Sequence, residues 1–210
     1  MNTRSTNVCA FLLVCAAFAA GVFVYPSLPA TIAGHWNAAG EANGTLPRFW
    51  GVFLLPMIMG AIYLLFVGLP FLKELQKDLP PFRKTYNRFF LALMLFFLYI
   101  HSLTLWWNMG HSFDFSRALA PALGFLWIML GSTMGTVKRN SFIGIRTPWT
   151  LRSDEVWNKT HVIAKTLFQL SGVIALVGTF VPRYSFFFSI IPVLLTSLIV
   201  TIYSYRISNP

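Results

Sequence analysis

The chain has 210 residues, of which 56% are hydrophobic and 10% are charged, whereas an average soluble domain is about 45–50% apolar and about 25% charged. Together with a mean hydropathy of +0.65, this composition excludes an ordinary soluble enzyme, a disordered chain and a disulfide-stapled secreted module, because so short a chain cannot hide so many apolar side chains from water. The formal net charge of +10 is compatible with nucleic-acid binding or with the basic loops of a membrane protein, and the placement of the basic residues distinguishes the two.

Six apolar runs have about the length needed to cross the hydrocarbon core of a bilayer, which takes about 20 helical residues. The fifth run is short, and residues 162–164 can extend it. Pro56 and Pro121 lie inside runs, where neighbouring helices satisfy the freed carbonyls. The sequence therefore predicts an all-α fold, a polytopic integral membrane bundle of six transmembrane helices. The predicted spans are residues 8–24, 49–72, 89–107, 119–137, 166–181 and 186–203.

The first run allows a second interpretation. Arg4, the apolar stretch and Ala17-Phe18-Ala19 resemble a cleavable secretory signal. The run continues to residue 24, beyond these small residues, and this favours a retained helix. Cys9 and Cys15 fall in the same run, where a thiol is usually a small packing residue.

The connection after the first run, residues 25–40, contains more polar and aromatic side chains than a simple turn requires. Pro26 and Pro29 impose an extended path and lack backbone donors. His35-Trp36-Asn37 then presents an imidazole, a large ring and an amide before a turn at Gly40. One interpretation is an interfacial loop held by Trp36. The other is an exposed surface that recognises a peptide or a lipid.

The connection after the fourth run, residues 140–151, is equally rich. Gly144 permits a tight backbone turn, and Pro148 favours an extended Thr147. Arg146 stands between apolar neighbours, so its planar guanidinium is suited to a carboxylate, a phosphate or free helix carbonyls. The alternative is a basic loop that only sets membrane topology.

A helix is predicted directly after this loop. Ser153 is a suitable N-cap, and Asp154 and Glu155 fall in the first turn, where the helix dipole favours anions. One face of this helix runs into the fifth span. That face carries Trp157, Thr160 or His161, Ala164 and Phe168.

The basic residues divide unequally between the two sides. With the N-terminus inside, thirteen of the sixteen Lys and Arg residues are cytoplasmic, and Arg48, Arg117 and Arg183 are outside. This distribution predicts cytoplasmic N- and C-termini. It explains the net charge by contact with the lipid bilayer and without direct binding of nucleic acid. The predicted cytoplasmic residues are Arg4, Lys73, Lys77, Arg83, Lys84, Arg88, Lys138, Arg139, Arg146, Arg152, Lys159, Lys165 and Arg206.

Reactive side chains are scarce within the predicted spans. All six acidic residues lie outside them, which argues against ion-coupled transport. His35, His101 and His111 lie on separate segments without metal-ligand spacing, and no nucleophile motif is present. We therefore expect a protein without enzymatic activity, cofactor or metal. A small transporter or lipid-handling membrane protein is the alternative.

Both rich connections resemble one bacterial family. The run from Asn140 to Leu151, followed by Val156-Trp157-Asn158-Lys159-Thr160-His161, is similar to the most distinctive stretch of the SdpI family of membrane immunity and signalling proteins. Tyr25-Pro26-x-Leu28-Pro29, His35-Trp36-Asn37 and Gly40 resemble the small domain of unknown function that often precedes it. Ala33, where that domain often has proline, and residues 162–165 depart from the common pattern.

The resemblance implies a non-catalytic protein of the bacterial cytoplasmic (inner) membrane that gives immunity to, or senses, a secreted peptide toxin. It also implies that a cytoplasmic repressor or other protein binds the inner side. We expect an N-terminal helix pair (residues 1–72), a basic cytoplasmic loop (73–88) and an SdpI-like four-helix module (89–210). The candidate residues for binding a partner or ligand are Tyr25, Pro26, Pro29, His35, Trp36, Asn37, Asn140, Gly144, Arg146, Thr147, Pro148, Trp149, Thr150, Trp157, Thr160 and His161.

Overall fold

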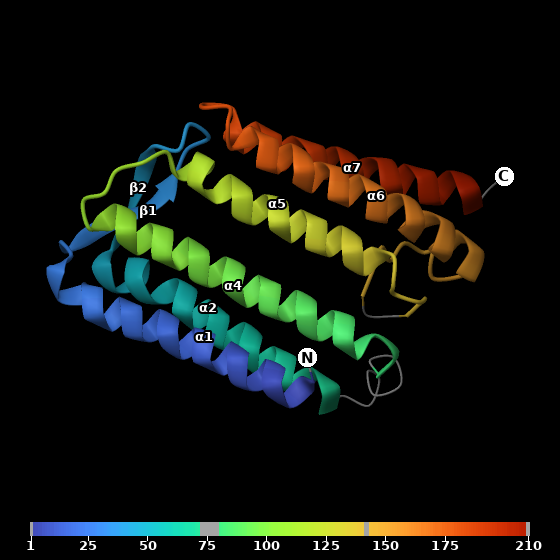
Figure 1. The fold of residues 1–210 in the computed structure, drawn as a ribbon, viewed down its shortest axis with the longest axis horizontal. Coiled ribbons are helices and arrows are strands. Elements are labelled where there is room, and N and C mark those ends of the chain that lie inside the picture. Colours follow the sequence, from blue (N-terminus) through green and yellow to red (C-terminus); the bar gives the residue numbers. More distant parts are fainter. Residues whose placement is uncertain (1, 72–79, 141–142, 209–210) are drawn as a thin grey trace.

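The computed structural model describes residues 2–71, 80–140 and 143–208, and within these ranges six long helices form an elongated bundle (Figure 1). Each helix is long and apolar enough to cross a membrane. The prediction of six transmembrane helices is therefore confirmed in number, and each helix overlaps one predicted span. The helices are α1 (Thr3–Val24), α2 (Arg48–Gly68), α4 (Arg83–Asn108), α5 (Phe115–Met134), α6 (Asp154–Gly178) and α7 (Ser185–Ser208).

The helix that follows the second rich connection continues without interruption into the fifth span. Helix α6 begins at Asp154, and the Ser153 hydroxyl accepts a hydrogen bond from Val156 N at 3.3 Å, which is the predicted N-cap. Three short 3-10 helices, η1 (Tyr25–Ser27), η2 (Leu69–Phe71) and η3 (Pro80–Phe82), flank the longer elements. Helix α4 begins at Arg83, so the second half of the segment predicted as a basic loop is helical, and Lys73 and Lys77 lie outside the described residues.

A β-hairpin stands where the sequence predicted only a loop. Strands β1 (Thr31–Trp36) and β2 (Ala42–Pro47) pair antiparallel, with Ile32 opposite Leu46. The Asn37 side chain builds the turn, because its Oδ1 accepts from Ala39 N at 2.9 Å and from Glu41 N at 3.0 Å. Irregular pairing beside His35 obscures the alternation of apolar and polar residues that indicates a strand.

The helices pack as two groups of three that meet where α4 lies beside α5 (Figure 1). One core joins α1, α2 and α4 around Met59 and Met94, and the other joins α5, α6 and α7 around Ala164 and Val200. Helices α5 and α6 approach closely at glycines. A Cβ at Gly172 would lie only 2.5 Å from Gly124 O, so the contact requires a glycine there.

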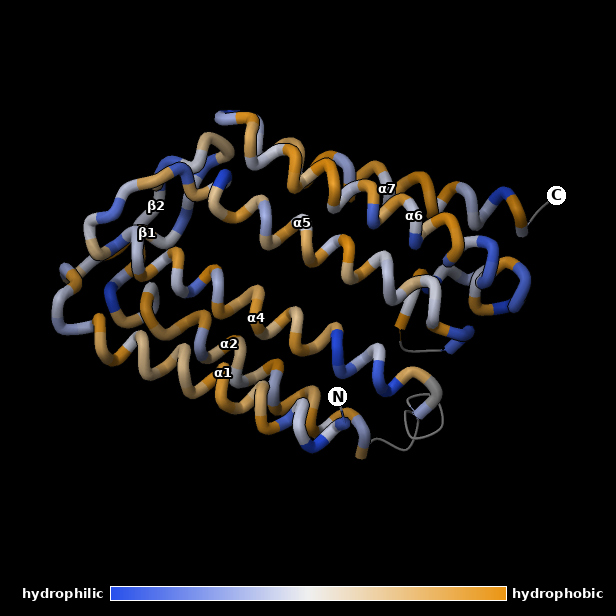
Figure 2. Tube along the Cα trace, in the orientation of Figure 1, coloured by the Kyte–Doolittle hydropathy of each residue, from blue (hydrophilic) through white to orange (hydrophobic). Residues whose placement is uncertain are grey.

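The two ends of the bundle differ in charge, and we name them the hairpin end and the basic end. The hairpin end carries β1 and β2, and Arg48, Arg117 and Arg183 lie at the helix termini there. The basic end carries both chain termini and the α5–α6 connection, and hydrophilic residues gather on it (Figure 2). The described basic residues of this end are Arg4, Arg83, Lys84, Arg88, Lys138, Arg139, Arg146, Arg152, Lys159, Lys165 and Arg206.

The two cysteines do not fill the core. Cys9 and Cys15 are free thiols, and both are exposed on the surface of α1. The expectation that they act as small packing residues was therefore wrong. In the bilayer, this face of a spanning helix meets lipid.

Candidate functional site

The sequence-predicted site residues gather in two clusters, one at each end of the bundle. The hairpin cluster consists of η1, β1, β2 and the helix ends that hold them. The loop cluster consists of residues 136–153, without the undescribed residues 141 and 142, and the first turns of α6. Each cluster therefore unites residues that the sequence assigned to one connection, and the two clusters do not form a common site.

Asn108, the last residue of α4, fastens the hairpin to the bundle. Its Oδ1 accepts from Ala33 N at 2.8 Å, and its Nδ2 donates to Ala33 O at 3.0 Å and to Thr104 O at 2.8 Å. One amide thus satisfies both backbone groups of Ala33. The sequence did not identify Asn108, although an amide directly after Trp106-Trp107 at the end of a span was a usable signal.

Arg48 makes a second attachment, at the base of the hairpin. Its Nη1 donates to Leu28 O at 2.8 Å and to Tyr25 O at 3.3 Å, and its guanidinium lies 4.3 Å from the centre of the Tyr25 ring. A cation–π contact and two carbonyl acceptors therefore stabilise the turn between α1 and β1. Pro26 and Pro29 are exposed on this turn. Arg48 had been assigned only to the charge balance.

Trp36 packs into the bundle and is half-buried. Its ring stacks on Phe115, with ring centres 3.9 Å apart, and meets Trp107 edge-on at 5.9 Å. Its buried Nε1 has no hydrogen-bond partner among the described residues. Trp36 therefore joins the hairpin to α4 and α5, as the anchoring interpretation expected, although the anchor is a protein contact.

His35 and Asn37 lie at the end of β1, one on each side of Trp36. His35 is exposed, and its Nδ1 lies 2.6 Å from Asn43 Oδ1 on the opposite strand. Asn37 is half-buried, donates to Glu41 Oε2 at 3.0 Å and holds the turn described above. A cavity of about 370 Å³ lies beneath the hairpin among α2, α4 and α5, and both residues line it. Its size falls within the usual range of small-ligand pockets.

The loop cluster is assembled around His161 and Trp157 of α6. His161 Nδ1 lies 2.8 Å from Trp157 O, and His161 Nε2 accepts from Ile145 N at 3.1 Å, a pattern that fits the neutral ring with its proton on Nδ1. The Trp157 ring stacks on His161 at 4.1 Å and donates from Nε1 to Val137 O at 2.9 Å. Trp157 is fully buried, so both residues hold the loop on the helix.

Gly144 is required by this close packing. Its φ is +121°, a region that L side chains rarely adopt, and a Cβ there would lie 2.6 Å from His161 Nε2. The predicted tight turn at Gly144 is therefore confirmed. Asn140, which is buried, bonds both backbone groups of Ile143, because it accepts from Ile143 N at 2.7 Å and donates to Ile143 O at 3.0 Å.

Thr150 organises the second half of the loop. It is fully buried, and its hydroxyl donates to Ile145 O at 2.7 Å and accepts from Thr147 N at 2.9 Å. Thr160 is also fully buried, and its Oγ1 has no partner among the described residues. These threonines are therefore internal to the loop cluster and face no solvent.

Trp149 and Arg139 make further contacts that hold the loop cluster in place. Trp149 Nε1 donates to Ser204 Oγ on α7, and the Trp149 ring meets Tyr205 edge-on at 5.3 Å. Arg139 Nε pairs with Asp154 Oδ1 at 2.6 Å, and its Nη1 donates to Leu151 O at 2.7 Å. The sequence did not identify Ser204 or Arg139, because neither position is marked by local spacing.

Arg146 differs from the rest of its motif. It is exposed and makes no hydrogen bond or ion pair with any described residue. Of the three acceptors that the sequence left open for its guanidinium, free helix carbonyls are therefore not used. Pro148, two residues further on, is also exposed. The loop cluster thus presents Arg146 on a framework of buried tryptophan, histidine and threonine side chains.

The histidines do not converge on a common site. His101 is buried in α4, with its Nε2 3.1 Å from Ala17 O of α1, as expected for an imidazole that bonds to a neighbouring helix. His111 stacks on Trp106 at 4.1 Å. Among the described residues, no group of three or more His, Cys, Asp or Glu side chains is arranged to hold a metal ion.

Six apolar helices, basic loops concentrated at one end and two polar clusters at the ends define a multi-pass helical membrane protein. Comparison with known proteins shows what the chain is similar to. The model of the SdpI/YfhL protein family matches residues 136–204, and the model of a domain of unknown function (DUF1648) matches residues 12–60. The immunity protein SdpI of Bacillus subtilis (strain 168) is 29% identical over 202 residues, which cover 95% of this chain and 94% of that protein.

These matches confirm the resemblance to the SdpI family that was inferred from the two connections. The match to the domain of unknown function contains η1, β1, β2 and the first part of α2, and the SdpI match contains the loop cluster with α6 and most of α7. No solved structure matches the chain.

Proposed function

We propose that this protein is a non-catalytic immunity protein of the bacterial cytoplasmic membrane that protects its cell from a secreted peptide toxin. The single observation that supports this most is similarity to a protein named an immunity protein over nearly the full length of both chains. The similarity includes both clusters, so it extends to the polar parts of the molecule as well as to its apolar helices.

The two ends suit different parts of this role. We assign the hairpin cluster to the outer face, where His35 and the cavity beneath the hairpin offer polar and apolar contacts to a peptide. We assign the loop cluster to the cytoplasmic face, where the guanidinium of Arg146, which has no partner among the described residues, offers a planar donor to a carboxylate of a regulatory protein. The basic charge of that end supports this orientation.

The test is survival of a strain that lacks the gene. Deletion and wild-type cells are exposed to peptide fractions from the supernatants of neighbouring bacteria, and the deletion strain is complemented with the intact gene. We expect at least one fraction to kill the deletion strain selectively and the intact gene to restore survival. Equal survival of the two strains in every fraction would contradict the immunity role.

Complementation with His35→Ala separates recognition from membrane insertion. His35 is exposed and its side chain bonds Asn43 of the neighbouring strand, so the variant should reach wild-type abundance in the membrane. We expect protection to fall. The matched control is His111→Ala, because His111 is also an exposed histidine at the hairpin end but lies outside the hairpin. Full protection by both variants would remove His35 from the recognition surface.

A further inference from the structure

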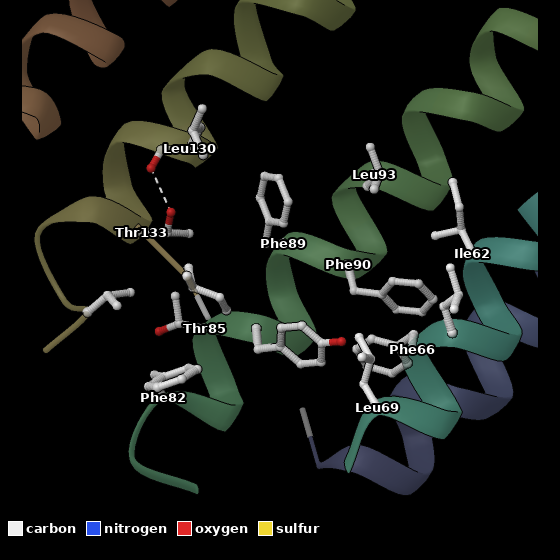
Figure 3. Close-up of a pocket in the computed structure, with 14 residues that line it drawn as sticks. Ile62, Phe66, Leu69, Phe82, Thr85, Phe89, Phe90, Leu93, Leu130 and Thr133 are labelled. Carbon is white, nitrogen blue, oxygen red and sulfur yellow. Dashed lines mark hydrogen bonds between the residues drawn. The ribbon is translucent and has the colours of Figure 1, made fainter. Parts of the chain in front are cut away.

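A pocket of about 310 Å³ opens between the two groups of helices, toward the basic end (Figure 3). Its walls come from α2, α4 and α5, and Phe89, Phe90 and Leu93 of α4 point toward it. The two threonine hydroxyls in the wall are already bonded, since Thr133 Oγ1 donates to Leu130 O at 2.6 Å and Thr85 Oγ1 lies 3.4 Å from Thr136 Oγ1. The lining therefore offers a ligand little besides apolar contact.

A polar groove adjoins this pocket. Asn2, Thr3, Arg83 and Lys84 line the groove, and Phe82 and Thr85 line both the groove and the pocket. The Arg83 guanidinium lies 5.6 Å from the ring centres of Phe66 and Tyr86, two rings of the pocket wall. Lys84 is exposed and has no ion-pair partner among the described residues. An apolar site and two cations thus stand side by side at the end of a membrane bundle.

We propose that the pocket and the groove together bind one anionic phospholipid, with an acyl chain between α2, α4 and α5 and the headgroup phosphate at Arg83 and Lys84. The position of the pocket and the charge at its rim indicate a lipid as the ligand. The pocket lies among membrane-spanning helices, where lipid is the apolar solvent, and a positively charged rim selects an anionic headgroup. The volume of about 310 Å³ is at the lower end of the range for small-ligand sites.

The second lateral groove between α4 and α5 provides an internal comparison. It is lined by apolar residues and Tyr99, among them Leu126 and Met129, and no basic residue lines it. Ordinary bilayer lipid of any charge can cover such a groove. Charge selectivity is therefore the property that distinguishes the proposed site, and this site is independent of the immunity role proposed above.

The test uses the purified full-length chain and two probes with identical acyl chains, phosphatidylglycerol and phosphatidylcholine. Native mass spectrometry measures lipid retention, and thermal unfolding in detergent measures stabilisation. We expect retention of phosphatidylglycerol to exceed that of phosphatidylcholine, and we expect Lys84→Gln to weaken phosphatidylglycerol binding about fivefold, the effect of one basic residue on an anionic lipid. Arg206→Gln is the matched control, because it removes one exposed charge from the same end but on α7.

A second pair of variants tests the acyl-chain pocket. Leu93→Trp fills the pocket, whereas Leu126→Trp makes the same change in the other groove. We expect only Leu93→Trp to abolish the stabilisation by phosphatidylglycerol. Equal retention of the two lipids, or equal loss with Leu93→Trp and Leu126→Trp, would overturn the proposal. If Leu93→Trp fails to fold, the comparison of Lys84→Gln with Arg206→Gln decides the question.

Discussion

The hairpin cluster and the loop cluster differ in the sequence separation of the contacts that hold them in place. The hairpin depends on partners distant in sequence, since Ala33 bonds Asn108 across 75 positions and Asn37 O accepts from Ser116 across 79. The loop depends mainly on near neighbours, since Ile145 bonds His161 across 16 positions and Trp157 bonds Val137 across 20. The position of the hairpin is therefore set by the packing of α4 and α5, whereas the loop is carried by α6.

The two clusters also divide structural and exposed residues differently. In the loop, most motif residues face inward, and Arg146 and Pro148 are exposed. In the hairpin, His35 is exposed directly beside the half-buried Trp36 and Asn37. A motif recognisable in sequence thus contains many residues that hold a surface in place and few that form it. Substitutions can therefore separate the residues that hold the surface from the residues that form it.

The largest expected effect is the all-or-none labelling of cysteines placed at the two ends of the bundle, which shows the side of the membrane on which each end lies. In a background with Cys9→Ser and Cys15→Ser, we expect Ala39→Cys in the hairpin to react with an impermeant thiol reagent applied from outside. Arg146→Cys in the loop should react only after the cells are opened, because the more basic end stays in the cytoplasm. Ala39 is preferable to Gly40, whose φ of +79° a cysteine rarely adopts. Labelling of Arg146→Cys in intact cells would reverse the assignment of the two ends.

The next largest effect concerns Trp157, on which the loop cluster rests. Trp157→Ala removes a fully buried ring and the donor to Val137 O, and we expect a loss of stability of about 3–5 kcal/mol. Thermal unfolding of the purified protein measures this loss. Trp106→Ala is the matched control at the other end, since Trp106 is 53% exposed, and its midpoint should stay near that of the wild type. Similar midpoints for the two variants would show that the loop does not depend on Trp157.

The helices could be predicted from sequence because a span is a local property. Apolar length alone located all six, and the Ser153 cap with Asp154 and Glu155 located the start of α6. The hairpin could not be predicted in the same way. Its strands are short and irregular, and their docking depends on Asn108 and Phe115, which lie on helices far along the chain.

The candidate site residues could be predicted as a set but not by role. Spacing placed Trp157, His161 and Phe168 on one face of a helix, and the structure buries all three. Spacing did not show that the Thr150 hydroxyl joins Ile145 to Thr147, or that Arg146 has no partner among the described residues. Those facts depend on the path of the loop over α6, which no periodic pattern encodes.

A smaller effect, on binding and not on folding, is expected for Arg146. Arg146→Lys keeps the charge and breaks no bond within the described protein, so insertion and the unfolding midpoint should not change. Lysine cannot reproduce the planar fork of a bidentate contact. Binding of the cytoplasmic partner should weaken about tenfold to hundredfold, which corresponds to about 1.5–3 kcal/mol for a charged hydrogen bond.

The readout for Arg146 is protection in the complemented deletion strain, together with co-purification of the partner at equal membrane abundance. Arg152→Lys is the matched control, because Arg152 is exposed on the same connection and bonds the described residues only through its backbone N. We expect Arg152→Lys to behave as the wild type. If Arg146→Lys also behaves as the wild type, Arg146 does not contact the partner, and the motif only sets the membrane topology and supports the loop.

The smallest effect is a loosening of the hairpin at Asn108. Asn108→Ala leaves both backbone groups of Ala33 without the amide, but the site lies at the edge of the bundle, where water can replace part of the lost bonding. The cost should therefore be near the lower limit for an unpaired polar group, about 1–1.5 kcal/mol, and hydrogen exchange of the Ala33 amide should accelerate about tenfold. Asn108→Asp keeps the acceptor for Ala33 N and loses the donor to Ala33 O, so its exchange should be intermediate. Asn43→Ala, which removes only an exposed contact to His35, should leave the exchange unchanged. Equal exchange in all three variants would mean that Trp36 and Arg48 hold the hairpin without Asn108, and that its attachment to α4 is not the step that positions the hairpin cluster.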